Sequence, residues 1–295
     1  MTRILNFNPR FWHTKATVAY NTHSHLVDME VAVRKGLAKP KPGTYYYVHV
    51  LDNMLYAHQS HPFTLAYVRD GSAYGRVCAS RASSAEATER DPLLASTAAT
   101  RTTPSLVFLI RPYDGFTSRL AQQASAGPRS LRVLVEGPYG HTAPLRQYRH
   151  VLFIVGGTGI AVPLSHLADV LSDESAVINL RIVWAVREQE FLTCVLNEFR
   201  DLLQDKRVSL EAHVTQDMEN KDELDGKGYK KVKIEMGRPD VHAVVADAVD
   251  EANHESLAIM ACGPAQMADQ ARQASVTMLA KGARGIDYFE ESFKW

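Results

Sequence analysis

The sequence has few cysteines, no excess of charge of either sign and no long apolar run. Its three cysteines (Cys78, Cys194 and Cys262) are far apart and form no Cys-x-x-Cys pair. We therefore expect a reducing compartment and no disulfide framework. The 33 basic residues balance 33 acidic ones, which argues against nucleic acid or an anionic membrane as the main partner.

The most apolar segment, residues 151–164, contains three glycines and a proline. It is shorter than the roughly 20 residues that a membrane-spanning helix needs. Residues 1–12 alternate polar and apolar side chains, so no N-terminal signal is visible. We expect the chain as given to be soluble.

The first half of the chain is typical of β-structure. Short β-branched or aromatic runs are punctuated by Asn, Pro and Gly, without long helical periods between them. They cover residues 17–20, 26–33, 44–50 and 106–110. This pattern predicts an antiparallel β-barrel or a sandwich. Residues 78–103 are rich in Ala, Ser, Thr and Arg and indicate a mobile insertion in a loop.

The second half alternates strand and helix patterns, which predicts an α/β doubly wound parallel sheet. Strands are expected at 151–155, 180–186, 208–214, 257–261 and 286–293. Helices are expected at 162–171, 191–203, 241–249 and from Pro264 to about Lys281, with Pro239 opening the third of them. A chain of 295 residues is long enough for two domains, and we place their boundary near residue 147.

The most specific local motif is Gly156-Gly157-Thr158-Gly159, between a buried strand and a helix. Free amides and the helix dipole favour a phosphate group at such a helix N-terminus. Glycines allow the tight turn and a close approach of the ligand to the backbone. The alternative is a ligand-free glycine turn, because short glycine patterns recur.

Two further candidates follow strands of the same half, at the ends where ligands bind in open α/β sheets. Arg187 follows Trp184-Ala185-Val186, and its planar guanidinium suits the 2′-phosphate of NADPH. A surface salt bridge is the alternative for this arginine. Cys262-Gly263-Pro264 offers a backbone suited to a nicotinamide, or simply a buried cysteine with capping residues.

In the β half, His61-Pro62-Phe63-Thr64-Leu65 places a proline, an aromatic ring and polar donors side by side. These groups could stack on a flavin and bond its ribityl chain, whereas periodicity alone indicates an edge strand. Downstream, Arg111 precedes Gly115-Phe116-Thr117, a predicted helix start with a hydroxyl. Together they indicate a second phosphate site, although Arg111 alone could be a solvated charge.

With these pieces in order, the chain resembles the cytosolic dehydrogenase portion of the ferric reductase and NADPH oxidase family, whose fold is that of ferredoxin–NADP reductase. The matching segments, in order, are His61-Pro62-Phe63-Thr64, Glu136-Gly137-Pro138-Tyr139-Gly140, Gly156-Gly157-Thr158-Gly159-Ile160, Trp184 with Arg187, Gly237-Arg238-Pro239, Cys262-Gly263-Pro264 and Phe289-Glu290-Glu291-Ser292-Phe293-Lys294-Trp295. Asn8-Pro9-Arg10-Phe11-Trp12 and Lys41-Pro42-Gly43-Thr44-Tyr45-Tyr46-Tyr47 resemble the fungal ferric reductase branch.

The resemblance implies a role for each matching segment. Residues 1–147 would form the FAD-binding barrel and residues 148–295 the NADPH-binding domain. His61 to Leu65 would line the isoalloxazine and ribityl chain, and Arg111 with Gly115, Phe116 and Thr117 would hold the FAD pyrophosphate. Gly156, Gly157, Thr158, Gly159 and Ile160 would cradle the NADPH pyrophosphate, with Trp184 beside them and Arg187 at the 2′-phosphate. Cys262, with Gly263 and Pro264, would lie near the nicotinamide as a catalytic residue, and Trp295 would cover the flavin until nicotinamide replaces it.

Members of this family carry a haem-binding membrane domain ahead of the module, and no such domain precedes it here. The resemblance therefore implies a fragment, or a soluble relative, of a protein at the cytosolic face of a membrane. In the intact protein, electrons from NADPH would pass through FAD and membrane haems to ferric chelates. The alternatives are a superoxide-generating NADPH oxidase module, or a non-catalytic module that keeps only the fold. No metal ligand set is expected in the chain itself.

Overall fold

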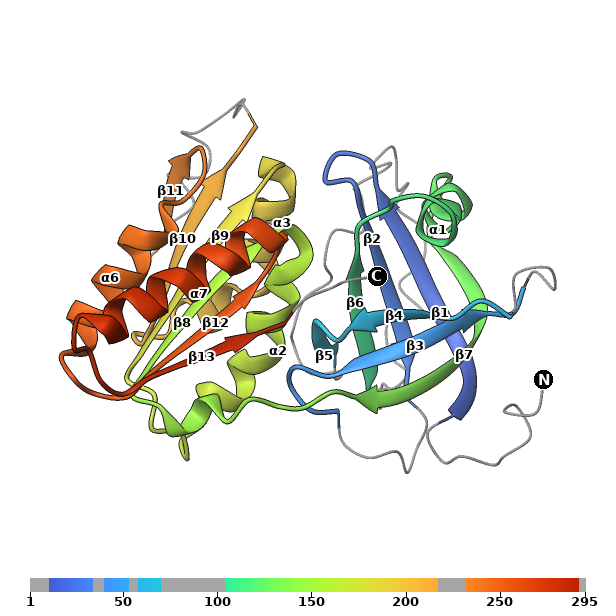
Figure 1. Ribbon diagram of the computed structural model, residues 1–295. Helices are drawn as coiled ribbons and strands as arrows, with labels where there is room; N and C mark the ends of the chain where they lie inside the picture. Colours follow the sequence, from blue (N-terminus) through green and yellow to red (C-terminus); the bar gives the residue numbers. More distant parts are fainter. Residues whose placement is uncertain (1–10, 34–39, 53–57, 70–103, 217–231, 292–295) are drawn as a thin grey trace, which may run out of the picture.

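A computed structural model describes residues 11–33, 40–52, 58–69, 104–216 and 232–291. These residues form two lobes that lie side by side, each built around one sheet (Figure 1). The first sheet is antiparallel and the second is parallel. The predicted succession of a β domain and an α/β domain is therefore confirmed.

The first lobe is a seven-stranded antiparallel sheet in the order β4-β3-β7-β1-β2-β6-β5. Its two edge strands, β4 and β5, are separated in sequence only by Leu65 and Ala66, so the sheet curls round into a barrel. Side chains alternate between core and surface, as on β3, where every second residue is buried. The strands are β1 (Phe11–Asn21), β2 (Leu26–Ala32), β3 (Tyr45–Val50), β4 (His61–Thr64), β5 (Tyr67–Arg69), β6 (Ser105–Ile110) and β7 (Arg129–Tyr139).

One helix, α1 (Phe116–Ala124), closes the barrel core. Its apolar residues recur at helical spacing, and Phe116, Leu120, Ala121 and Ala124 are buried among the strand side chains. Gly115 caps its N-terminus at a φ of 64°, a backbone conformation that glycine adopts at little cost. The helix start predicted at Gly115-Phe116-Thr117 is confirmed.

The second lobe is a six-stranded parallel sheet in the order β11-β10-β9-β8-β12-β13. Its central strands β8 and β12 are buried along nearly their whole length, as expected when helices cover both faces. The strands are β8 (His150–Gly156), β9 (Asn179–Val186), β10 (Val208–Val214), β11 (Val232–Met236), β12 (Leu257–Cys262) and β13 (Ile286–Glu290).

Helices cover the two faces of this sheet in two groups. The 3₁₀ turn η2 (Gly157–Ile160), α2 (Ala161–Val170), α3 (Gln189–Glu198) and α4 (Arg200–Leu203) share a core with one face. Helices α6 (Val241–Ala252) and α7 (Ala265–Ala280) share a core with the other face. The same two layers are visible in Figure 1, where α6 and α7 lie in front of the sheet.

The two lobes are joined by a continuous apolar core. Tyr67 of β5 packs edge-on against Phe199, with ring centroids 5.0 Å apart. Val107 and Leu109 of β6 belong to the same buried cluster as α2 and α3. The connection between the lobes runs from β7 through the 3₁₀ turn η1 (Leu145–Gln147) to β8. This apolar contact places the carboxyl-end edge of the parallel sheet next to the barrel.

Several local expectations need correction. The helix expected at 191–203 is divided at Phe199, whose φ and ψ of −103° and 19° interrupt it. Pro239 does not open α6; the N-cap is Asp240, whose side chain accepts hydrogen bonds from the backbone amides of His242 and Ala243. Strand β11 was not predicted, because its residues are polar or only half-buried. The expected insertion at 78–103 lies outside the described residues.

The thiol of Cys262 is free, but Cys194 is disulfide-bonded, so the expectation of a chain without disulfides is wrong at Cys194. Among the described residues, no helix is long and apolar enough to cross a membrane.

Candidate functional site

The glycine turn and the Cys262-Gly263-Pro264 segment lie next to each other. They follow β8 and β12, which pair in parallel with Val155 opposite Cys262. The chain continues from β8 to β9 on one side, whereas β12 lies on the other side. Such a reversal of strand order opens a crevice at the carboxyl ends of the strands, where ligands bind in this class of sheet.

The two segments approach so closely that only glycines fit between them. A Cβ on Gly159 would lie 2.3 Å from the carbonyl oxygen of Cys262, and one on Gly156 would lie 2.7 Å from Pro264 Cδ. A Cβ on Gly263 would lie 3.0 Å from the Gly156 nitrogen. These glycines are therefore required by packing of one turn against the other.

Gly157 is different, because it faces open space. Its φ is +54°, and no atom lies within 4 Å of where its Cβ would be. No side chain caps the start of η2 or α2, so their first amide groups are available to a ligand. Open backbone at a helix start fits the phosphate groups of a dinucleotide.

The Trp184 side chain holds the glycine turn in place. It is completely buried, its Nε1 donates a hydrogen bond of 2.9 Å to the Gly157 carbonyl oxygen, and its ring packs edge-on against Phe191. The expected direct contact of the Trp184 side chain with the coenzyme is not supported, since the side chain has no accessible surface. It positions the glycine turn instead.

Cys262 is also completely buried. Burial raises the pKa of its thiol well above the usual range, and the neighbouring carboxylates of Glu291 and Glu290 raise it further. The thiol is therefore protonated at neutral pH, and Gly159 packs against it. A catalytic role for Cys262 would be that of a neutral group at the wall of the crevice.

On the barrel, β4 forms a partly exposed aromatic surface together with α1. The His61 ring stacks on Phe116 with centroids 4.2 Å apart, and Phe63 lies 6.1 Å from the same ring. His61, Pro62, Phe63 and Thr64 are all partly accessible. Leu65 is not: it is 2% exposed and its amide donates to the Thr44 carbonyl oxygen, so it belongs to the barrel core.

Arg111, after β6, crosses from the barrel to the other lobe. Its guanidinium forms a two-point ion pair with Glu188, with Nη1 at 3.1 Å from Oε2 and Nη2 on Oε1. Nearby, Thr117 Oγ1 accepts a hydrogen bond from the Tyr113 amide. No side chain caps α1, and the position of a Cβ on Gly115 is open. This region also fits a phosphate group, although Arg111 already has a carboxylate partner.

Arg187 is largely exposed, with 63% of its side chain accessible. Its Nε lies 4.0 Å from Oε1 of the same Glu188. Glu188 therefore contacts both arginines that we assigned to phosphate groups. Sequence reasoning missed Glu188, because its main partner, Arg111, lies 77 residues away in the sequence.

A second group missed from the sequence joins the lobes at the end of β13. A Cβ on Gly43 would lie 2.8 Å from Glu291 Oε1 and 3.2 Å from His166 Nε2, and the Gly43 amide donates to Ser165 Oγ at 3.1 Å. Burial raises the pKa of Glu291 to about 7 and lowers that of His166 to about 4. Gly43 and Glu291 lie in segments that carry the family resemblance, which was the available signal. Trp295, four residues further on, lies outside the described residues.

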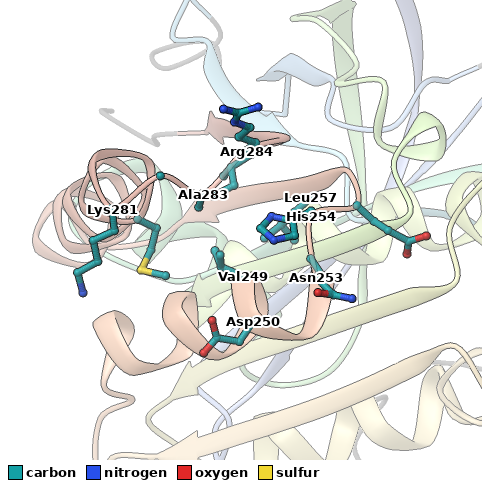
Figure 2. Close-up of a pocket in the computed structure, with 13 residues that line it drawn as sticks. Val249, Asp250, Asn253, His254, Leu257, Lys281, Ala283 and Arg284 are labelled. Atoms are coloured by element: carbon teal, nitrogen blue, oxygen red, sulfur yellow. The ribbon is translucent and has the colours of Figure 1, made fainter.

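A separate hollow of about 310 Å³ lies at the other end of the parallel sheet, between the ends of α6 and α7. Figure 2 shows the charged ends of Arg284, Lys281 and Asp250 pointing in different directions, without a common focus. It is far in the fold from the glycine turns, since it lies where β12 and β13 begin. We assign it no ligand.

The fold and the glycine-lined crevice define a two-domain protein in which an antiparallel barrel lies beside a parallel α/β sheet of the dinucleotide-binding type. Residues 11–143 match the family model described as FAD-binding domain, and residues 148–276 match the one described as ferric reductase NAD binding domain. The chain belongs to the ferric reductase family. This confirms the resemblance seen in the sequence and the expectation of FAD and a nicotinamide dinucleotide as cofactors.

Related proteins agree with this assignment. The chain is 28% identical over 294 residues to ferric reductase transmembrane component 3 of Saccharomyces cerevisiae, covering 88% of this chain and 36% of that protein. It is 28% identical over 292 residues to ferric/cupric reductase transmembrane component 2 of the same yeast, covering 87% and 36%. The chain thus spans about a third of the length of these curated relatives.

Solved structures share the fold. A ferredoxin NADP+ reductase from Neisseria gonorrhoeae, solved with bound FAD and NADP, has a TM-score of 0.60 at 14% identity, covering 95% of this chain and 98% of that one. The CS-b5R domains of human Ncb5or have a TM-score of 0.58 at 15% identity, covering 95% and 70%. These likenesses confirm the two-domain architecture.

Proposed function

We propose that this chain is the dehydrogenase module of an NADPH-dependent ferric-chelate reductase. FAD bound to the barrel would take a hydride from NADPH and release the electrons singly. The observation that carries this proposal is the close packing of Gly156 and Gly159 against Cys262-Gly263-Pro264, with open backbone at Gly157. This open backbone lies where the strand order of the sheet reverses.

The chain's own residues would bind and orient the two cofactors. His61, Pro62, Phe63 and Thr64 are the accessible groups of β4 for the flavin ring and ribityl chain. Arg111 and the start of α1 would hold the FAD pyrophosphate. The Gly157 turn would hold the coenzyme pyrophosphate, and Arg187 the 2′-phosphate that distinguishes NADPH from NADH.

Two groups near the crevice, Cys262 and Glu291, would set the charge and proton content of its wall. The Cys262 thiol, with its raised pKa, presents an uncharged wall. The pKa of Glu291 near 7 lets its carboxyl hold or release a proton at neutral pH, and it lies beside His166 Nε2 and Gly43, where barrel and α2 meet. A group of this kind suits proton handling next to a redox cofactor.

The electron acceptor follows from the relatives rather than from the chain. The curated relatives are named as transmembrane components of ferric reductases. We therefore infer that the immediate partner of this chain is a haem-containing membrane domain. The chain itself would lie on the cytosolic side of that membrane. Ferric chelates would be the final acceptor. The alternative, a superoxide-generating oxidase, is less favoured because the matching relatives carry ferric reductase names.

A visible absorption spectrum of the purified protein incubated with FAD tests this function. Bound flavin should bleach on addition of NADPH without oxygen and recover with ferricyanide as an artificial acceptor. NADH should bleach it more slowly. A protein that binds no flavin, or whose flavin NADPH does not reduce, would overturn the proposed function.

A further inference from the structure

Outside the cofactor sites, two strands at the edge of the parallel sheet bring together an imidazole and two carboxylates. Glu211 and His213 lie two residues apart on β10, and Glu235 lies opposite His213 on β11. One ligand atom of each side chain lies within 4.8 Å of the others. β11 is the outermost strand of this sheet (Figure 1); β10 lies two strands from β8, and β11 lies three strands from it.

Glu211 fixes the tautomer of the histidine. Arg181 donates a hydrogen bond of 3.0 Å to Glu211 Oε2, so this carboxylate is paired with a guanidinium. His213 Nε2 lies 2.9 Å from Glu211 Oε1. Since a carboxylate only accepts hydrogen bonds, Nε2 must carry the proton. In the neutral imidazole, Nδ1 then presents a lone pair.

This lone pair is buried without a donor. Only 5% of the His213 side chain is exposed, and within the described parts of the chain Nδ1 has no hydrogen-bond partner. Glu235 Oε2 lies 3.9 Å from Nδ1. Two hydrogen-bond acceptors thus face each other across a gap, and a cation between them would satisfy both.

We propose that His213 Nδ1 and Glu235 bind a divalent transition metal ion of the zinc class, with Glu211 orienting the imidazole. Imidazole and carboxylate are ligands that such ions accept. A histidine ligand usually donates its second ring N–H to a carboxylate, as His213 does to Glu211. The ion would link β11 to β10 and hold the edge strand on the sheet.

The site is open on the side of Glu235. That side chain is 40% exposed, and Lys233, whose Nζ lies 2.5 Å from Glu235 Oε1, is 66% exposed. Lys233 can turn into solvent when an ion binds, since it is the most exposed member of the cluster. The competing arrangement is a doubly protonated His213 between the two carboxylates, without a metal.

Two measurements on the chelator-treated full chain distinguish the metal site from the metal-free arrangement. They are isothermal titration calorimetry with Zn²⁺ and the visible absorption spectrum with Co²⁺. One saturable site per chain is expected, weakened at least tenfold in His213→Gln and in Glu235→Gln, and roughly ten- to a hundredfold in Glu211→Gln. His242→Gln, which removes an exposed imidazole from α6, should bind Zn²⁺ like the wild type.

Flavin content and bleaching by NADPH serve as the fold check for every variant. Because the site lies away from the cofactor crevice, both should be unchanged, so a failure of the reductase function is recognised separately. Absence of saturable Zn²⁺ binding in the wild type would overturn the metal site. Equal Zn²⁺ affinity in wild type and in folded Glu235→Gln would overturn it as well.

Discussion

The guanidinium of Arg111, at the end of β6, pairs at two points with the carboxylate of Glu188, at the start of α3. The pair joins the barrel to the α/β lobe and is mostly buried, with 20% of the arginine and 9% of the glutamate side chain exposed. Glu188 also lies 4.0 Å from Arg187. Glu188 would therefore compete with phosphate groups for both arginines of the proposed cofactor sites.

Replacement of Arg111 by Ala should weaken FAD binding by about 1.5–3 kcal/mol, the usual contribution of a hydrogen bond to a charged group. Fluorescence titration of the flavin-free protein with FAD measures this change. Glu188→Gln is the matched control: it keeps Arg111 but removes the competing charge, so FAD should bind as tightly as before or more tightly. Wild-type affinity in Arg111→Ala would remove this residue from the pyrophosphate site.

The exposed Arg187 should decide between the two coenzymes. Arg187→Ala should raise the KM for NADPH by about tenfold or more, because a charge-assisted contact to the 2′-phosphate is lost. The KM for NADH should change little, since NADH lacks that phosphate. Steady-state reduction of ferricyanide with each coenzyme gives both values. An equal loss for NADPH and NADH would show that Arg187 acts structurally.

Alanine variants of two glycines in the glycine turn should distinguish a packing role from a role in ligand binding. Gly159→Ala forces a Cβ to within 2.3 Å of the Cys262 carbonyl oxygen and should lower the free energy of unfolding by about 1–3 kcal/mol. Gly157→Ala meets no protein atom, so its stability cost is about 1–2 kcal/mol, from its positive φ alone. The new methyl group would instead obstruct the coenzyme.

Thermal unfolding and NADP+ titration of both variants check this division. Gly157→Ala should lose most of its NADP+ affinity while it remains folded and retains FAD. If Gly157→Ala binds NADP+ like the wild type, the open space above this residue does not receive the phosphate groups.

The parts of the site that depend on local chemistry could be predicted from the sequence. A glycine-rich run between a buried strand and a helical pattern is a local signal, and the turn at Gly157 between β8 and α2 was predicted from it. The partners of those residues could not be predicted. Glu188 reaches Arg111 over 77 residues of sequence, and nothing local distinguishes it from a solvated glutamate.

The burial of individual side chains also could not be predicted from the sequence. Trp184 stands in a motif that carries the family resemblance, and Leu65 was expected to line the flavin, yet both side chains are in the core. β11 was missed because an edge strand with alternating lysine and glutamate, such as Lys233 and Glu235, lacks the apolar signal of a buried strand. In each case the missing information is the tertiary neighbour.

Arg69, at the end of β5, is surrounded by carboxyl groups of both lobes. It pairs with Glu30 on β2, and its Nη2 lies 3.6 Å from Oε1 of Glu198 on α3. A third carboxyl group, that of Asp28, has an inaccessible oxygen without a hydrogen-bond partner in the described part of the chain. The single positive charge of Arg69 cannot neutralise three carboxylates.

Burial therefore raises the pKa of Asp28 to about 7, although Arg69 opposes the shift, and Glu198 behaves in the same way. A carboxyl group whose pKa is higher in the folded state binds its proton more tightly there. Its contribution to stability is present at low pH and is lost as the pH rises through about 7. The contact between the lobes should weaken over that range.

Asp28→Asn should remove this pH dependence, because an amide fills the same space and does not ionise. The variant should exceed the wild type in unfolding free energy at pH 8, and the difference should shrink toward pH 5, by at most about 1.4 kcal/mol per pH unit for one group. Urea unfolding at several pH values between 5 and 8.5 measures it. Asp52→Asn is the control, since Asp52 pairs with the exposed Arg132 at the surface and its loss should matter little at any pH. If both variants shift in parallel, net charge and not the buried cluster sets the pH dependence, and the assignment to Asp28 fails.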